Sequence, residues 1–206
     1  MIKAVLFDMD GVLVNSFNAW LALINDTARH FDYSEISKAS FMSVYGQSTE
    51  KDVEAFFPGR TVHEIDTYYA DHFHEHSSRV EIAPSTIEVL EKIKNYTLSF
   101  SVITNTSGGL ARKIIRELGI EIELVIGGDE VPASKPAPDI VYRACELLDV
   151  STDEAVVVGD SIYDIQAATS AGAISVGVHG VKGDKTIAGL EELPDLLEIL
   201  GVSKRK

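Results

Sequence analysis

Residues 7–16 read FDMDGVLVNS, and this stretch decides the fold. It places Asp8 and Asp10 two residues apart, directly after an apolar run at residues 4–7. In an extended strand, side chains at positions i and i+2 point to the same side, so both carboxylates would project from the strand's carboxyl end. Ligands bind at that end of open α/β sheets, and Gly11 permits a tight turn beside one. An Asp-x-Asp pair without further context is more often simply solvated, so the interpretation of this pair depends on the residues around it.

Further apolar runs rich in β-branched residues follow, mostly separated by stretches with helical periodicity. They lie at residues 99–103, 124–126, 155–158 and 174–178. Such runs are typical of strands buried on both faces, and their alternation with helices predicts right-handed βαβ units. The expected fold class is therefore α/β, a Rossmann-like parallel sheet with helices on both faces.

Local signals mark the ends of several helices. Capping-box patterns begin at Thr49, Thr61 and Ser85, Gly119 is expected to stop a helix, and Pro194 is expected to open the last one.

One long interval, residues 15–82, departs from the alternation of strands and helices. It has helical spacing throughout and no convincing strand, which predicts about four helices. We therefore expect an α/β core made of residues 1–14 and 83–206, and an all-helical module made of residues 15–82.

Composition limits the cellular compartment and the classes of partner that we expect for this protein. The 206 residues, 45% of them hydrophobic, suffice for a core without a metal or disulfide. The single Cys145 cannot form an internal disulfide, and the first apolar run is too short for a signal peptide, so we expect a cytoplasmic protein. No apolar stretch approaches the roughly 18 residues of a membrane span. A net charge of −14 argues against nucleic acid and acidic membranes, and it would also repel an anionic substrate.

Two later segments carry side chains that suit a phosphate group. Residues 104–109 read TNTSGG after a predicted strand, where hydroxyls and glycines could bind a phosphoryl oxygen, although ordinary helix capping is an equal alternative. Lys135 lies in the loop SKPAPD at residues 134–139, which two prolines stiffen. A lone surface lysine is usually just solvated, but a restricted backbone makes sense if the ammonium group must meet a phosphate.

A second pair of carboxylates follows another predicted strand. Asp160 ends the run VVVGD, and Asp164 comes four residues later at a helix start. By themselves they could reflect helix capping alone. With Asp8 and Asp10 nearby they make a hard, oxygen-rich site suited to Mg²⁺.

In this order and context, the four segments resemble the haloacid dehalogenase superfamily of phosphotransferases, and the resemblance covers nearly the whole chain. The helical module is similar to that superfamily's cap, placed directly after the first motif; small members with this layout include phosphoglycolate phosphatase and β-phosphoglucomutase. We call residues 15–82 the cap from here on. The resemblance implies a Mg²⁺-dependent phosphatase that acts on a small phosphomonoester, either phosphoglycolate-like or a sugar phosphate. It also implies a monomer or small homo-oligomer, with neither nucleic acid nor membrane as a partner.

The resemblance also implies roles for single residues. Asp8 would attack phosphorus and form an aspartyl phosphate, while Asp10 would protonate the leaving alkoxide and later activate water. The phosphoryl group would be bound by Asp8, Gly11, Thr104, Asn105 and Lys135. Thr104 and Lys135 would also act in catalysis, by hydrogen bonding and by neutralising charge. Mg²⁺ would be held by Asp8, the backbone carbonyl of Asp10, Asp160 and Asp164, the last directly or through water.

Two other functions stay open at this point. A β-phosphoglucomutase-like phosphomutase would share the covalent step, although such mutases often carry Glu-Asp where this chain has Gly159-Asp160. A non-catalytic module that binds phosphorylated metabolites is less favoured, because it has no need for a nucleophile.

Three features of the cap have alternative interpretations. Residues 45–48, YGQS, resemble a loop that reaches over the active site in relatives, or are a plain turn between helices. In residues 72–76, HFHEH, a helix would place His72 and His76 on one face, which favours an exposed, titrating surface over a metal site. Trp20 is expected in the core of the cap, with stacking on a substrate as the alternative.

Overall fold

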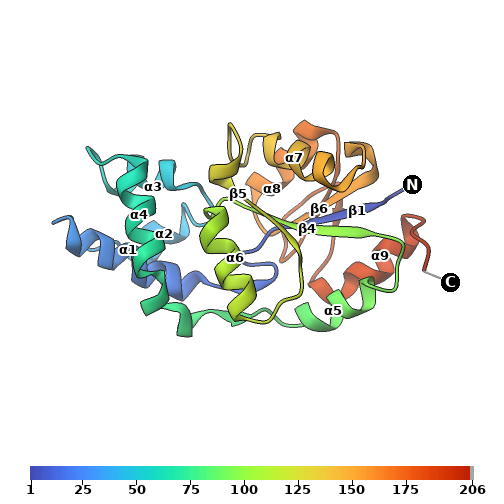
Figure 1. Cartoon of the computed structure of the whole chain (residues 1–206), viewed down its shortest axis with the longest axis horizontal. Helices are drawn as coiled ribbons and strands as arrows, with labels where there is room; N and C mark the ends of the chain where they lie inside the picture. The colour runs from blue at the N-terminus through green and yellow to red at the C-terminus, as the bar shows by residue number, and fades with distance from the viewer. Residues whose placement is uncertain (205–206) are drawn as a thin grey trace.

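The computed structural model describes residues 1–204 and shows a parallel sheet beside a group of helices (Figure 1). The five predicted strands are confirmed as β1 Ala4–Phe7, β4 Ser99–Thr104, β5 Leu124–Gly127, β6 Ala155–Gly159 and β7 Ile174–Gly177. The sheet order is β5-β4-β1-β6-β7-β8, and every neighbouring pair is parallel. β1 therefore lies in the middle, with the ends of β4 and β6 on either side of it.

Alternating side chains of β1 explain why both faces of the sheet are covered. Ala4 and Leu6 pack with α7 Asp139–Leu148 and α8 Ile162–Ala171. Val5 and Phe7 belong to the other cluster, with α5 Thr86–Ile93, α6 Gly108–Glu117 and α9 Leu193–Ile199. Figure 1 shows α7 and α8 on the side opposite α5 and α9. The expected α/β fold is thus confirmed, because strands that are apolar on both faces need a helix layer on each.

The cap consists of helices, as the spacing predicts. They are α1 Phe17–His30, α2 Lys38–Met42, α3 Thr49–Phe56 and α4 Val62–His72, followed by 3₁₀ turns at Phe73–Glu75 and Ser77–Arg79. Helix α4 packs against both α1 and α3. No helix within residues 1–204 has both the length and the apolar composition needed to cross a membrane.

Three very short strands were not predicted. β2 Val14–Asn15 pairs antiparallel with β3 Glu81–Ile82, where the chain leaves and re-enters the sheet region. β8 Lys185–Thr186 adds an exposed, parallel edge to the sheet. Two residues are too few to show any periodicity, which is why the sequence gives no sign of them. We propose that the β2–β3 pair marks the limit between the α/β core and the cap at residues 15–82.

The capping predictions had mixed outcomes. Thr61 is confirmed, since its hydroxyl accepts from the Glu64 N–H at 3.2 Å and the Glu64 carboxylate accepts from the Thr61 N–H at 2.8 Å. The prediction for Ser85 is wrong, because its backbone is left-handed at φ 66° and its side chain makes no capping bond. The prediction for Thr49 is also wrong: the helix begins at Thr49 itself, and its hydroxyl donates to Asp66 at 2.6 Å. Two other signals are confirmed, Gly119 just after α6 and Pro194 in the first turn of α9.

The capping geometry at Thr61 and Ser85 predicts different effects of alanine substitution on the free energy of unfolding. Thr61→Ala should lower the free energy of unfolding by about 1 kcal/mol, because it removes one capping bond from an exposed helix start. Ser85→Ala is the matched control and should stay within about 0.5 kcal/mol of the wild type, because no capping bond is lost. Urea denaturation measures both, and equal losses would contradict the capping geometry.

Candidate active site

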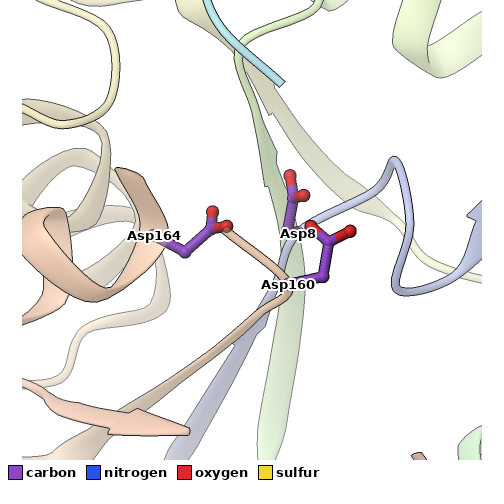
Figure 2. A group of neighbouring side chains, drawn as sticks. All are labelled: Asp8, Asp160 and Asp164. Atoms are coloured by element: carbon purple, nitrogen blue, oxygen red, sulfur yellow. The ribbon is translucent and has the colours of Figure 1, made fainter. Parts of the chain in front are cut away.

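Three aspartates converge at the carboxyl ends of the central strands. Asp8 follows β1, Asp160 follows β6, and Asp164 lies in the first turn of α8. Figure 2 shows their carboxylates gathered at one point, and oxygens from the three side chains lie within 4.8 Å of one another. The parallel pairing of β1 with β6 brings these segments together across about 150 residues of sequence.

Lys135 is the cation at this centre. Its ammonium group donates to Asp8 at 2.7 Å, to Asp164 at 2.6 Å and to the Ile103 carbonyl at 3.1 Å. The lysine is only 4% exposed, so these bonds are shielded from water. Asp164 is held from its other side by the Ser161 N–H at 3.1 Å and by the Ser161 hydroxyl, in the cap of α8. Both of its oxygens are therefore engaged, and it orients Lys135 as well as its own helix.

One lysine does not balance the acidic side chains. Burial raises the pKa of Asp8 well above its ordinary value, Asp164 raises it further, and Lys135 opposes the rise. Burial and Asp164 likewise raise the pKa of Asp160 to about 7, again against Lys135. The site has fewer positive than negative side chains, and the atoms that could bind an ion are hard carboxylate oxygens. This donor set fits a divalent cation such as Mg²⁺.

Asp10 faces away from the carboxylate group and toward the cap. It accepts hydrogen bonds from the Trp20 indole N–H at 3.1 Å, from the Thr106 hydroxyl at 3.1 Å and from Ser16. The Thr104 hydroxyl lies 3.5 Å from the same carboxylate and accepts from the Thr106 N–H at 3.1 Å. The Asp10 carboxylate lines the cavity and is held by residues of both the cap and the α/β core.

Two predicted phosphate-binding residues already have other partners. Asn105 donates to the Gly46 carbonyl and to the Lys135 carbonyl, both at 3.0 Å, and accepts from the Lys135 N–H at 2.9 Å. Gly11 donates its N–H to the Val14 carbonyl at 2.8 Å and has φ 86°. A Cβ at Gly11 would lie 1.9 Å from an Asp160 oxygen, so glycine there makes room for the Asp160 carboxylate. Any phosphate contact of Asn105 would have to come from its backbone.

The loop between α2 and α3 reaches across from the cap to the α/β core. Besides the Asn105 bond to Gly46, Gln47 donates to the Tyr163 hydroxyl on α8 at 2.7 Å. The hydroxyls of Tyr45 and Ser16 are 2.8 Å apart, and Ser16 bonds Asp10. Of the two interpretations of residues 45–48, the one that reaches over the site describes this geometry.

Between the cap and Asp8 lies a cavity of about 50 Å³, room for only a few water molecules. The sequence could not predict most of this lining, because the residues come from several distant segments, among them all four cap helices and the loop. They are Asp8, Asp10, Trp20, Ile24, Phe41, Val44, Tyr45, Gly46, Gln47, Thr49, Asp52, Tyr69, Thr104, Asn105 and Thr106. Trp20 packs on Tyr69 and Phe73, as expected for the cap core, yet it also faces the cavity. Helical periodicity could only have placed it on an inward side.

The predicted exposed histidine face is wrong for His76. Helix α4 ends at His72, so the two side chains do not share one helical face. His76 is buried and bonds the Asp26 carboxylate of α1, whereas His72 stacks on Tyr68. The bond from His76 to Asp26 ties the end of the cap to its first helix.

Comparisons with known proteins bear on the family and the fold of this chain. The family model for haloacid dehalogenase-like hydrolases matches residues 5–178. The chain is 29% identical to a phosphoglycolate phosphatase of Neisseria meningitidis, over 100% of this chain and 96% of that protein. It is 27% identical to the pyrophosphatase PpaX of Anoxybacillus flavithermus, over 99% of both chains. The crystal structure of a subfamily IA hydrolase from Geobacter sulfurreducens is similar in fold, with a TM-score of 0.78 at 23% identity, covering 95% of this chain and 100% of that one.

The charge imbalance predicts how stability depends on pH without metal. The folded-state pKa of Asp160 is raised from 3.8 to about 7, so the native state binds more protons than the unfolded chain between these values. The contribution of Asp160 to the free energy of unfolding should therefore fall as pH rises through this range. In urea denaturation with chelator, Asp160→Asn should show a smaller fall than the wild type. An equal or larger fall in the variant would contradict the assignment.

Proposed function

This chain belongs to the haloacid dehalogenase-like hydrolase family, and we propose that it is a Mg²⁺-dependent phosphatase that hydrolyses a small phosphomonoester through an aspartyl phosphate on Asp8. The observation that carries the proposal is the buried contact of Lys135 with Asp8 beside two further aspartates. A carboxylate paired with a lysine, at an acidic site that fits a divalent cation, suits nucleophilic attack on phosphorus. We place the enzyme in the cytoplasm, a proposal supported by the free, buried Cys145 thiol.

In the first step, an Asp8 oxygen attacks phosphorus and the bond from phosphorus to the alcohol oxygen breaks. Asp10 donates a proton to the departing oxygen, so the alcohol leaves neutral. The Trp20 and Thr106 donors fix the Asp10 carboxyl for this role at 3.1 Å each. In the second step Asp10 takes a proton from water, which attacks phosphorus and releases phosphate and Asp8.

The remaining residues manage charge. Lys135 favours the ionised form of Asp8 against the effect of burial, and it offsets negative charge on the transferring group. The Thr104 hydroxyl, at the end of β4, would donate to a phosphoryl oxygen. When bound by Asp8, Asp160 and the Asp10 backbone carbonyl, with Asp164 behind them, Mg²⁺ would neutralise the repulsion between nucleophile and phosphate.

Replacing the nucleophile gives the direct test of this chemistry. Asp8→Asn should lower turnover of p-nitrophenyl phosphate by roughly 10³-fold or more, because an amide cannot form the acyl phosphate. Its fold should persist, since the change removes one of several mutually repelling carboxylates. Asp153→Asn, an exposed position, is the matched control and should keep full activity. Substantial turnover by Asp8→Asn would show that the nucleophile is assigned wrongly.

The second test separates a phosphatase from a phosphomutase, which differ in what accepts the phosphoryl group. We expect steady phosphate release with Mg²⁺ and no added acceptor or bisphosphate, loss of that release in excess chelator, and ¹⁸O from labelled water in the phosphate. Negligible release, together with conversion of glucose 1-phosphate to its 6-phosphate once a bisphosphate is added, would replace the phosphatase by the mutase.

A further inference from the structure

The cavity has two ends with different chemistry. One end is formed by Asp8, Asp10 and Thr104 of the α/β core, where the proposed phosphoryl transfer takes place. The other end belongs to the cap and includes Phe41, Tyr69 and Asp52. Because Asp10 protonates the leaving oxygen, the rest of the leaving alcohol must extend toward the cap end. The cap end therefore determines which alcohol fits, a conclusion that rests on the proposed phosphatase function.

In the part of the chain that the structure describes, the cap end has no cationic side chain that would pair with an anion. Among residues 1–204, no Lys, Arg or His lines the cavity, while Asp10 and Asp52 both do. Lys135 is committed to Asp8 and Asp164 below. A carboxylate or a second phosphate on the leaving group would lose its hydration without gaining a partner, and that desolvation is strongly unfavourable.

Asp52 is an acidic group that lacks a counterion. It accepts one hydrogen bond, from the Tyr69 hydroxyl at 3.1 Å, and forms no ion pair within the described chain. Burial raises its pKa to about 7, with Asp66 adding to the rise and the Tyr69 bond opposing it. A half-buried carboxylate that faces a cavity in this way is best stabilised by a cation supplied from the cavity side.

Aromatic rings line the path from Asp10 to Asp52. The Trp20 indole donates to Asp10, and its ring meets Tyr69 edge-on with centroids 5.6 Å apart. Tyr69 in turn donates to Asp52. Phe41 and Tyr45 form another edge-on pair in the lining, with centroids 5.6 Å apart. Aromatic faces beside a carboxylate are the environment in which proteins bind ammonium groups, because the ring quadrupole attracts a cation.

We propose that the substrate is the phosphate ester of a small amino alcohol, whose ammonium group binds between Asp52 and the rings of Trp20 and Tyr69. Its oxygen lies at Asp10 and its phosphoryl group at Asp8. The cavity of about 50 Å³ admits only a short carbon chain between the two ends. The overall charge of −14 favours a leaving group that is positive over one that is negative.

Three esters that differ mainly at the leaving-group terminus test this. They are 2-aminoethyl phosphate, 2-hydroxyethyl phosphate and phosphoglycolate, which end in an ammonium group, a hydroxyl group and a carboxylate. Measured by phosphate release with Mg²⁺ at neutral pH, kcat/KM should be about tenfold or more higher for the ammonium ester than for the hydroxyl ester. It should be lowest for phosphoglycolate.

Two variants on α3 locate the effect. Asp52→Asn should bring the ratio of kcat/KM for the ammonium and hydroxyl esters toward one. Glu54→Gln is the matched control, an exposed acid on the same helix outside the cavity lining, and should keep the wild-type ratio. Circular dichroism checks that both variants are folded. If Asp52→Asn does not fold, the ratio in the wild type decides by itself.

The possible outcomes separate this inference from the phosphatase proposal. A wild-type ratio of one or below, or a preference for phosphoglycolate, overturns the amino-alcohol assignment even while p-nitrophenyl phosphate is hydrolysed. A folded Asp52→Asn that keeps the full preference overturns the role of Asp52. Failure to hydrolyse any ester, p-nitrophenyl phosphate included, overturns the phosphatase proposal and with it this one.

Discussion

The buried contact between Lys135, Asp8 and Asp164 is the interaction on which the rest of the site depends. A lysine that is 4% exposed requires anionic partners, and two aspartates close together require a cation. Each group would be costly in that place without the others. The three side chains come from a loop, a strand end and a helix start, so their contact also fixes how those segments meet. β1 lies between β4 and β6, which brings the ends of these strands to the contact.

The Asp10 carboxylate connects the cap with the α/β core. Its carboxylate accepts from Ser16 and Trp20, at the start of the cap, and from Thr106 of the α/β core. If the cap moved away, Asp10 would lose the Trp20 donor. Asn105 links the same two parts, because its side chain bonds both the Gly46 carbonyl and the backbone of Lys135. The geometry proposed for proton transfer would thus be complete only while the cap shields the cavity from bulk water.

Acidic side chains lie at both ends of the cavity, and among the described residues each end lacks enough positive charge to balance them. At the core end of the cavity, the acidic groups exceed the single lysine and make a site for a divalent cation. At the cap end, Asp52 has no ionic partner in the described chain and faces a wall of aromatic rings. Both ends therefore complement positive charge, and in the proposed reaction Lys135 and the implied metal would help to bind the phosphoryl group between them.

The sequence by itself determined the elements with strong local signals. The apolar runs that became β1 and β6 are buried throughout, so their composition sufficed to predict them, and the position of Asp8, Asp160 and Asp164 after such elements predicted the acidic centre. Signals that depend on a single side chain were less certain. Thr61 caps its helix, whereas the same pattern at Ser85 fails because the backbone there is left-handed.

Only the tertiary structure decided what surrounds that centre. The sequence predicts Asn105 as a phosphate ligand. In the structure its side-chain amide instead bonds the Gly46 carbonyl of the cap loop and the Lys135 N–H. Trp20, Asp52 and Tyr69 lie on three different helices and meet only because α4 packs against α1 and α3. The reason is the distance along the chain over which each effect acts. Hydrophobic periodicity and helix capping involve residues a few positions apart, whereas a binding cavity is made by contacts between segments that are distant in sequence.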